Sequence, residues 1–261
     1  MIPKIIHYCW FGKGIMPKSQ SDCIKSWQSI MPDYKIMRWD ESNFDVNICD
    51  YSAKAYQAKK FAYVSDVARC KALYEIGGVY LDTDVDVFQR FDKYLDTNFF
   101  SAIELYNEFY KENIVTLLDD EGNPLDKNVE IPHMEILTSI MGVSVGNKLI
   151  KDAFDYYMNL KLSDNDNFFS IDRLMPKLAT LYGFRYKDET QYLSDNMVIY
   201  GTGIFGHAFC VNPSYTVSYH YNAASWDKKT SKQELMLKLD QYRLLGVYKW
   251  LKGIKNKILN R

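Results

Sequence analysis

The first eighty residues alternate between short apolar runs and longer stretches in which apolar positions recur at helical spacing. Short apolar runs favour strands, and helical spacing favours amphipathic helices. Pro17 and Ser19 are start signals for the first helix, and Gly77 and Gly78 end the last one. We predict strands at 4–10, 34–39 and 79–81, a helix at 19–30, and one or two helices at 53–76. This order is typical of an α/β fold whose mostly parallel central sheet is flanked by helices.

The pattern is less regular after residue 86. The turn-rich stretch 119–124, preceded by an apolar run at 113–118, indicates an exposed hairpin or excursion. The remaining apolar runs predict strands at 99–105, 136–143 and 215–221, and helices at 148–160 and 170–182.

Carboxylates follow the 79–81 strand at alternate positions, in the sequence Leu81-Asp82-Thr83-Asp84. Continued strand geometry would place Asp82 and Asp84 on one side, roughly 6 to 7 Å apart. An isolated Asp-x-Asp is usually a pair of solvated turn carboxylates. Here, however, the preceding apolar run places the pair at the carboxyl end of a buried strand, where open α/β sheets bind ligands. Because Mg²⁺ and Mn²⁺ use one or two carboxylates together with substrate phosphate oxygens, we predict a metal-bridged diphosphate.

Composition narrows the class of protein. A chain of 261 residues with 47% hydrophobic residues can bury one large core. A formal charge of -1, without basic blocks interleaved with aromatic residues, argues against nucleic acid as a partner. Five widely spaced cysteines without a Cys-x-x-Cys motif indicate reduced thiols in a cytoplasmic protein. We see no signal-peptide core at the amino terminus and no apolar run of membrane-spanning length.

The stretch 241–261 differs from the rest because it holds six basic residues and no acid. Its apolar residues, Trp250 among them, recur at helical spacing, which predicts a basic amphipathic helix. Such a helix can lie on an anionic membrane surface. The other interpretation is a terminal helix that docks its apolar stripe on the domain with its lysines solvated, and Gly246 and Gly253 weaken a helix in either case. We expect a catalytic domain at 1–233, an amphipathic segment at 234–261, and a peripheral location at the inner face of the membrane.

Four blocks carry a resemblance to a known family: 4–12 (KIIHYCWFG), 63–69 (YVSDVAR), 77–84 (GGVYLDTD) and 220–226 (HYNAASW). Together they resemble the DxD glycosyltransferases of family 32, which include bacterial capsular and exopolysaccharide transferases. The chain is more distantly similar to the large clostridial glucosylating toxins. The resemblance implies a GT-A fold, a nucleotide-sugar donor with UDP-sugar expected, Mn²⁺ or Mg²⁺, retention of configuration, and a saccharide or lipid-linked oligosaccharide acceptor.

The resemblance also implies roles for residues. Asp66 would bind hydroxyls of the transferred sugar, Arg69 would reach the sugar or diphosphate, and Asp84 would ligate the metal. Trp10 would stack on the base. The donor-binding set would be Tyr8, Trp10, Tyr80, Asp82, Ser225 and Trp226, and the metal set would be Asp84, Asp82, His220 and Asn222.

Several of these residues also have a purely structural interpretation. Asp66 and Arg69 are three apart on a predicted helix, so they could form only a surface ion pair. His220 alone would be a core histidine, and Trp10 alone a core tryptophan. Ser225 and Trp226 are adjacent here, whereas the toxins separate them by one residue, so the direction of Trp226 is open. His207, in a glycine-rich stretch, is a second candidate for the pocket rim.

Two other functions stay open at this stage. Phosphatases that form an aspartyl-phosphate also begin with an apolar strand and Asp-x-Asp, although their motif continues with Thr or Val where this chain has Asp86. A non-catalytic scaffold that binds a nucleotide sugar is the second alternative. For a transferase, front-face transfer needs no protein base, whereas a two-step route would use Asp66 as its nucleophile.

Overall fold

The structure, a computed structural model, describes residues 1–105, 116–126, 129–163, 167–207 and 215–222. The chain divides into two compact units, Met1–His220 and Tyr221–Arg261. The predicted helix at 241–261 and the segment 223–240 lie outside the described residues, so the predicted domain boundary and the predicted membrane helix stay predictions. Among the described residues, no helix has the length and apolarity needed to cross a bilayer.

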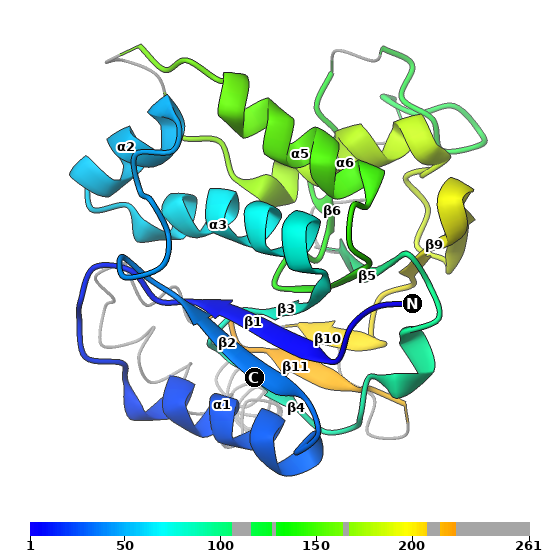
Figure 1. The fold of residues 1–261 in the computed structure, drawn as a ribbon. Helices are drawn as coiled ribbons and strands as arrows, with labels where there is room; N and C mark the ends of the chain where they lie inside the picture. Colours follow the sequence, from blue (N-terminus) through cyan, green and yellow to red (C-terminus); the bar gives the residue numbers. More distant parts are fainter. Residues whose placement is uncertain (106–115, 127–128, 164–166, 208–214, 223–261) are drawn as a thin grey trace, which may run out of the picture. The chain divides into compact units, whose positions relative to one another are not determined.

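The centre of the first unit is a sheet with strand order β2-β1-β3-β7-β5-β9-β8, and β6 pairs with β5 beside this path (Figure 1). β2, β1, β3, β5 and β9 run in one direction, whereas β7 and β8 run in the other. The predicted α/β class with a mostly parallel sheet is therefore confirmed. The strands are β1 Ile5–Cys9, β2 Lys35–Trp39, β3 Gly78–Leu81, β5 Phe99–Leu105, β6 Met134–Ile136, β7 Ile140–Val143, β8 Gln191–Leu193 and β9 Met197–Tyr200.

Helices cover both faces of the sheet, as Figure 1 shows. One face packs on a core that includes residues of α2, α3, α5 and α6, and the other packs on a core that includes α1. The helices are α1 Lys18–Ile30, α2 Asp50–Gln57, α3 Phe61–Ile76, α5 Lys148–Asn159 and α6 Ile171–Ala179, with short 3₁₀ turns η1 Asp92–Tyr94, η2 Thr180–Tyr182 and η3 Ser194–Asn196. Strand side chains alternate between the two cores, so Tyr80 belongs to the first and its neighbours Val79 and Leu81 to the second.

A second, three-stranded sheet lies on the α1 side, with order β10-β11-β4 (β10 Phe205–His207, β11 Ser218–His220, β4 Val85–Val87). α1 holds this sheet through Trp27, whose indole Nε1 donates to the Val85 carbonyl at 2.7 Å. The Ser26 hydroxyl accepts from the backbone N–H of Val87 at 3.0 Å. These two bonds fix the strand that directly follows Asp84.

The segment 53–76, predicted as one or two helices, forms two, because the chain leaves helical geometry between α2 and α3, where Lys59 has a φ of 57°. Two other predicted elements differ from the structure. The single strand predicted at 136–143 is wrong: the chain bends at 137–139 between β6 and β7. The strand predicted at 215–221 is shorter, with only Ser218–His220 paired. Residues 113–115 lie outside the described part, and 119–123 form a turn in which Asp119 accepts backbone N–H groups of Glu121 and Asn123.

His7, which lies in the first of the four family-like blocks, has a structural role. Its Nδ1 accepts from the Trp39 indole at 3.0 Å, which leaves a proton on Nε2 to donate to the Gly77 carbonyl at 2.8 Å. The ring thus ties β1 to β2 and to the entry of β3. Burial lowers the pKa of His7, which favours this neutral form.

Gly142 on β7 provides a test of the packing of the sheet. It stands opposite Phe100 of β5, and a Cβ at this position would lie 1.9 Å from a ring atom of Phe100. We expect Gly142→Ala to lower the free energy of unfolding by about 1–3 kcal/mol or more, because a buried ring must move. Gly14→Ala is the matched control, since a Cβ there meets nothing within 4 Å. Urea unfolding of both variants measures the difference, and equal midpoints would contradict the predicted clash.

The described cysteines, Cys9, Cys23, Cys49 and Cys70, are buried free thiols. Burial raises the pKa of the Cys9 thiol to about 12. These four side chains are therefore unreactive core residues at neutral pH.

Candidate functional site

The Asp-x-Asp motif forms a turn at the carboxyl end of β3. The strand ends at Leu81, and the Asp82 carbonyl accepts from the Val85 N–H at 3.0 Å. Asp82 N–H donates to the Ser139 carbonyl at 2.9 Å, which anchors the turn to the bend before β7. The expected position at the end of a buried strand is correct. The expected geometry, an extended strand with alternating side chains, is wrong, because a turn brings the two carboxylates toward each other.

His220 reaches this turn through strand pairing. β11 runs antiparallel to β4 and places His220 opposite Val85, the residue after Asp84. The pairing therefore joins positions that are 136 residues apart in the sequence (220 minus 84). Asp82, Asp84 and His220 form the group of metal-ligand side chains identified among the described residues.

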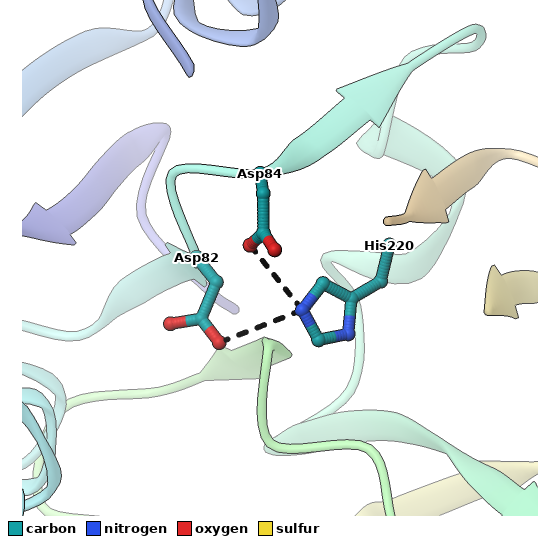
Figure 2. A group of neighbouring side chains, drawn as sticks. All are labelled: Asp82, Asp84 and His220. Carbon is teal, nitrogen blue, oxygen red and sulfur yellow. Dashed lines mark ion pairs between the residues drawn. The ribbon is translucent and has the colours of Figure 1, made fainter. Parts of the chain in front are cut away.

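The three side chains point toward one another, as Figure 2 shows. His220 Nε2 lies 3.3 Å from Asp84 Oδ1 and 3.9 Å from Asp82 Oδ2. Ligand atoms about 2.1 Å from one octahedral cation lie about 3 Å apart, so only small shifts would place all three around one ion. Two carboxylates and an imidazole suit Mn²⁺ and related divalent ions. The side chains present therefore fit a divalent cation.

The electrostatics of His220 reflect the two acids. Burial lowers the pKa of His220, but the charge of Asp84, its hydrogen bond and the charge of Asp82 together outweigh burial and raise the pKa to about 9. The two carboxylates therefore favour the protonated, positively charged form of His220. Nδ1 of His220 is buried and has no hydrogen-bond partner within the part of the chain that the structure describes.

Asp82 is held by two neighbours through a single oxygen. Its Oδ1 accepts from the Tyr80 hydroxyl at 2.9 Å and pairs with Arg69 Nη2 at 3.3 Å. Its Oδ2 is the atom that faces His220. Asp82 is the most exposed of the three, with 26% of its side chain accessible. The carboxylate is therefore oriented with one oxygen toward the protein and one toward the site.

Arg69 lies at the centre of the buried part of the site, on α3. Its guanidinium packs over the Tyr80 ring, 4.4 Å from the ring centroid. Nη2 lies 3.3 Å from both Asp66 and Asp82, and Nη1 donates to the Thr138 carbonyl at 3.0 Å. Burial lowers the pKa of Arg69, but the charges of Asp82 and Asp66 outweigh it, so the pKa is raised and the guanidinium stays charged.

Asp66 is buried, with only 6% of its side chain exposed. One oxygen pairs with Arg69, and the other accepts the backbone N–H of Ile171 at 3.2 Å, at the beginning of α6. Burial raises the pKa of Asp66 to about 8, against the opposing charge of Arg69. The interpretation of Asp66 and Arg69 as a surface ion pair is therefore wrong. The contacts that Asp66 makes in this structure are with the protein, so its predicted contact with a sugar stays a prediction.

Thr138 and Asp172 join this site and were missed by the sequence analysis. Thr138 contacts Arg69 Nη1 with both its carbonyl and its hydroxyl, and the hydroxyl donates to the Asp172 carboxylate. Burial raises the pKa of Asp172. The apolar run that contains Thr138 predicted a strand, and nothing in the sequence around Asp172 distinguishes it from other helix-start acids.

The other predicted residues have separate positions. Tyr8 on β1 packs edge-on against Trp27, with ring centroids 5.8 Å apart, and the Trp10 indole donates to the Gly14 carbonyl at 2.8 Å. Both side chains are partly exposed, whereas Tyr80 is buried. Asn222 belongs to the second unit and has a positive φ of 50°. Ser225, Trp226 and the side chain of His207 lie outside the described part of the structure.

Comparisons with known proteins agree with this location. Residues 17–101 match the family described as "Glycosyltransferase sugar-binding region containing DXD motif". Two curated relatives from Schizosaccharomyces pombe are similar over part of their length. Inositol phosphoceramide mannosyltransferase 3 is 37% identical over 36% of this chain, and inositol phosphoceramide mannosyltransferase 1 is 31% identical over 36%. The matches span only 27% and 31% of those two proteins.

Solved structures of glycosyltransferases are similar at lower identity. The galactosyltransferase LgtC, in complex with donor and acceptor sugar analogs, has a TM-score of 0.44 and 13% identity over 93% of this chain and 95% of its own. The PaToxG glycosyltransferase has a TM-score of 0.39 and 14% identity over 59% of each chain. The region that matches the DXD family contains Asp66, Arg69, Asp82 and Asp84, so the site described above lies mainly within a segment similar to the sugar-binding region of glycosyltransferases.

Proposed function

We propose that this protein is a metal-dependent, retaining glycosyltransferase of GT-A type that uses a nucleotide-sugar donor. The observation that carries the proposal is the meeting of Asp82, Asp84 and His220 at the end of β3, inside or next to a segment that matches a DXD glycosyltransferase region. Family 32 membership and a UDP-sugar as donor are part of the proposal and rest on the four sequence blocks.

The residues divide the work as follows. Asp82, Asp84 and His220 would hold Mn²⁺ or Mg²⁺. A cation held there would supply Lewis-acid stabilisation of the negative charge that develops on the diphosphate as its bond to the sugar breaks. Arg69 adds a fixed positive charge beside Asp82, and its burial strengthens its field.

Front-face transfer is the path we favour for retention. It requires a leaving phosphate oxygen to accept the proton of the acceptor hydroxyl, and needs no protein base. The alternative two-step route requires a carboxylate nucleophile. Asp66 fits that role poorly, because Arg69 and the Ile171 N–H already engage its two oxygens and its side chain is buried.

Donor hydrolysis is the first test. We would incubate the purified full chain with UDP-glucose, UDP-galactose and a nucleotide-activated mannose, with Mn²⁺ or with EDTA, and measure released nucleotide. The mannose donor is included because the curated relatives are named mannosyltransferases. Release that requires the metal and one of the donors supports the proposal. Binding without release would favour the scaffold, and no effect of any donor with Mn²⁺ on the melting temperature would contradict the proposal.

The acceptor is proposed to be a saccharide or lipid-linked oligosaccharide in surface polysaccharide synthesis at the cytoplasmic face of a membrane. The six basic residues of 241–261 support this location, since each contributes about 1 kcal/mol of attraction near an anionic surface. Deleting 241–261 is expected to release the protein from vesicles containing anionic lipid while donor hydrolysis persists. Unchanged vesicle binding in the deletion variant would contradict the membrane role.

A phosphatase is the competing enzyme. Its nucleophilic aspartate must be free to attack a phosphate, but here one oxygen of Asp82 is bound by Tyr80 and Arg69 and the other faces His220. Hydrolysis of a chromogenic phosphate ester that depends on Asp82 and needs no sugar would favour this function instead.

A further inference from the structure

The Arg69 guanidinium lies at equal distances from two carboxylates. Its Nη2 lies 3.3 Å from Asp66 and 3.3 Å from Asp82, and both distances exceed the roughly 2.8 Å that is typical of a strong charged hydrogen bond. A small in-plane rotation of the guanidinium would therefore move Nη2 from one acid to the other. The Tyr80 ring beneath the guanidinium allows such a rotation, because stacking restrains the plane and not the angle within it.

Thr138 fixes that rotation. Arg69 Nη1 lies 3.0 Å from the Thr138 carbonyl oxygen and 3.4 Å from its hydroxyl oxygen. The guanidinium is rigid and planar, so holding Nη1 determines where Nη2 points. The bend at 137–139 brings Thr138 to this place, and the neighbouring Ser139 carbonyl accepts from Asp82 N–H.

Asp172 determines the direction in which the Thr138 hydroxyl points its proton. A hydroxyl has one proton to donate and two lone pairs to accept with. The proton points to the Asp172 carboxylate, so a lone pair is left to face Arg69. Without an acceptor at Asp172, the hydroxyl is free to rotate and can turn its proton toward the guanidinium, where it would repel.

We propose that Asp172 and Thr138 are positioning residues that act through Arg69 to keep Asp82 Oδ2 directed at the metal. The proposal rests on the proposed function, since it takes Asp82, Asp84 and His220 as the metal ligands. The connection runs from Asp172 through the Thr138 hydroxyl and the Arg69 guanidinium to Asp82 Oδ1, and the other oxygen of Asp82 faces His220. Outer contacts of this kind orient the ligands of metal sites.

The test measures the affinity of the full chain for Mn²⁺ alone, from the loss of the free-ion EPR signal. Thr138→Val and Asp172→Leu, which removes the acceptor at similar volume, are each expected to weaken binding about tenfold, the lower end of the effect of outer-shell partners. Thr138→Ser keeps the hydroxyl and is expected to bind as the unsubstituted protein does. The double variant T138V/D172L is expected to bind no more weakly than the weaker single variant, because both changes break the same connection.

Thr97→Val is the matched control for loss of a threonine hydrogen bond. The Thr97 hydroxyl donates to the Tyr94 carbonyl at 2.8 Å, and neither residue is among those described above for the site. Its melting temperature shows the general cost of removing such a bond, and its Mn²⁺ affinity is expected to be unchanged. A drop in melting temperature for Thr138→Val with unchanged Mn²⁺ affinity would assign Thr138 to folding only and overturn the proposal.

The outcomes separate this inference from the proposed function. If the unsubstituted protein binds Mn²⁺ and Asp84→Asn does not, the metal site stands. Unchanged affinity in Asp172→Leu, or additive losses in the double variant, would then overturn the positioning role alone. If the unsubstituted protein and Asp84→Asn bind Mn²⁺ equally weakly, the metal site fails and the positioning role fails with it.

Discussion

Asp84→Asn is expected to reduce metal-dependent donor hydrolysis by about 10²- to 10³-fold, because it neutralises one of the two carboxylates that face His220. Asparagine has nearly the same shape, so the fold should persist. Mn²⁺ affinity should fall together with the rate. Initial rates of nucleotide release across a Mn²⁺ titration, with circular dichroism to verify folding, measure both effects.

Asp86→Asn is the matched control for that change. Asp86 continues the same alternating run of acids, but it lies on β4 opposite Tyr219 and is not part of the metal-ligand group. We expect its donor hydrolysis to stay within about twofold of the unsubstituted protein, as for a substitution away from the reacting groups. Equal losses in the two variants would show that general acidity near the turn, and not a specific ligand, supports the activity.

Arg69→Met is expected to lower the free energy of unfolding by about 3–5 kcal/mol at pH 8, because it leaves the buried Asp66 and the adjacent Asp82 without their cation. Methionine retains much of the volume of the side chain, so the loss is chiefly electrostatic. Arg69→Lys keeps the charge but cannot bridge Thr138 and both acids, so we expect an intermediate loss. Urea unfolding without added metal measures these values.

The free energy of unfolding of Arg69→Met should itself depend on pH in a defined direction. The pKa of Asp66 in the folded protein is raised by burial to about 8, above its value in the unfolded chain, so between about pH 4 and pH 8 the folded state binds more protons. Stability from this group is therefore present at low pH and is lost as pH rises toward 8. Asp66→Asn should flatten this slope in the Arg69→Met background. A slope that is unchanged by Asp66→Asn would assign the pH dependence to another group.

The local part of the site follows from sequence because it depends on neighbouring residues. An apolar run that ends in Asp82 and Asp84 placed the carboxylates at a sheet edge, and helical spacing placed Asp66 and Arg69 on one face of α3. The turn that follows Leu81 was not predictable, since Thr83 and Val85 favour an extended strand as much as a turn. Burial of Asp66 was also not predictable, because two charges at helical spacing usually lie on the surface.

The non-local part depends on pairings that no local pattern encodes. His220 meets Asp84 because of the register between β11 and β4, and a shift by one residue would turn its side chain to the other face. Thr138 meets Arg69 because the chain bends inside a run of apolar residues, where strand propensity is outweighed by bonds such as that from Ser101 Oγ to the Leu137 carbonyl. Asp172 reaches the site because the beginning of α6 is held at Asp66 by the backbone N–H of Ile171.

The pairing of β11 with β4 has a consequence for the order in which the protein matures on the ribosome. Asp82 and Asp84 emerge early in synthesis, whereas His220 emerges only after most of the first unit has been made. Contacts between such distant positions close late, after the local helices and hairpins have formed. A nascent chain would thus carry only the two carboxylates of the proposed metal site until β11 is made, and that late strand would supply the third side chain, His220.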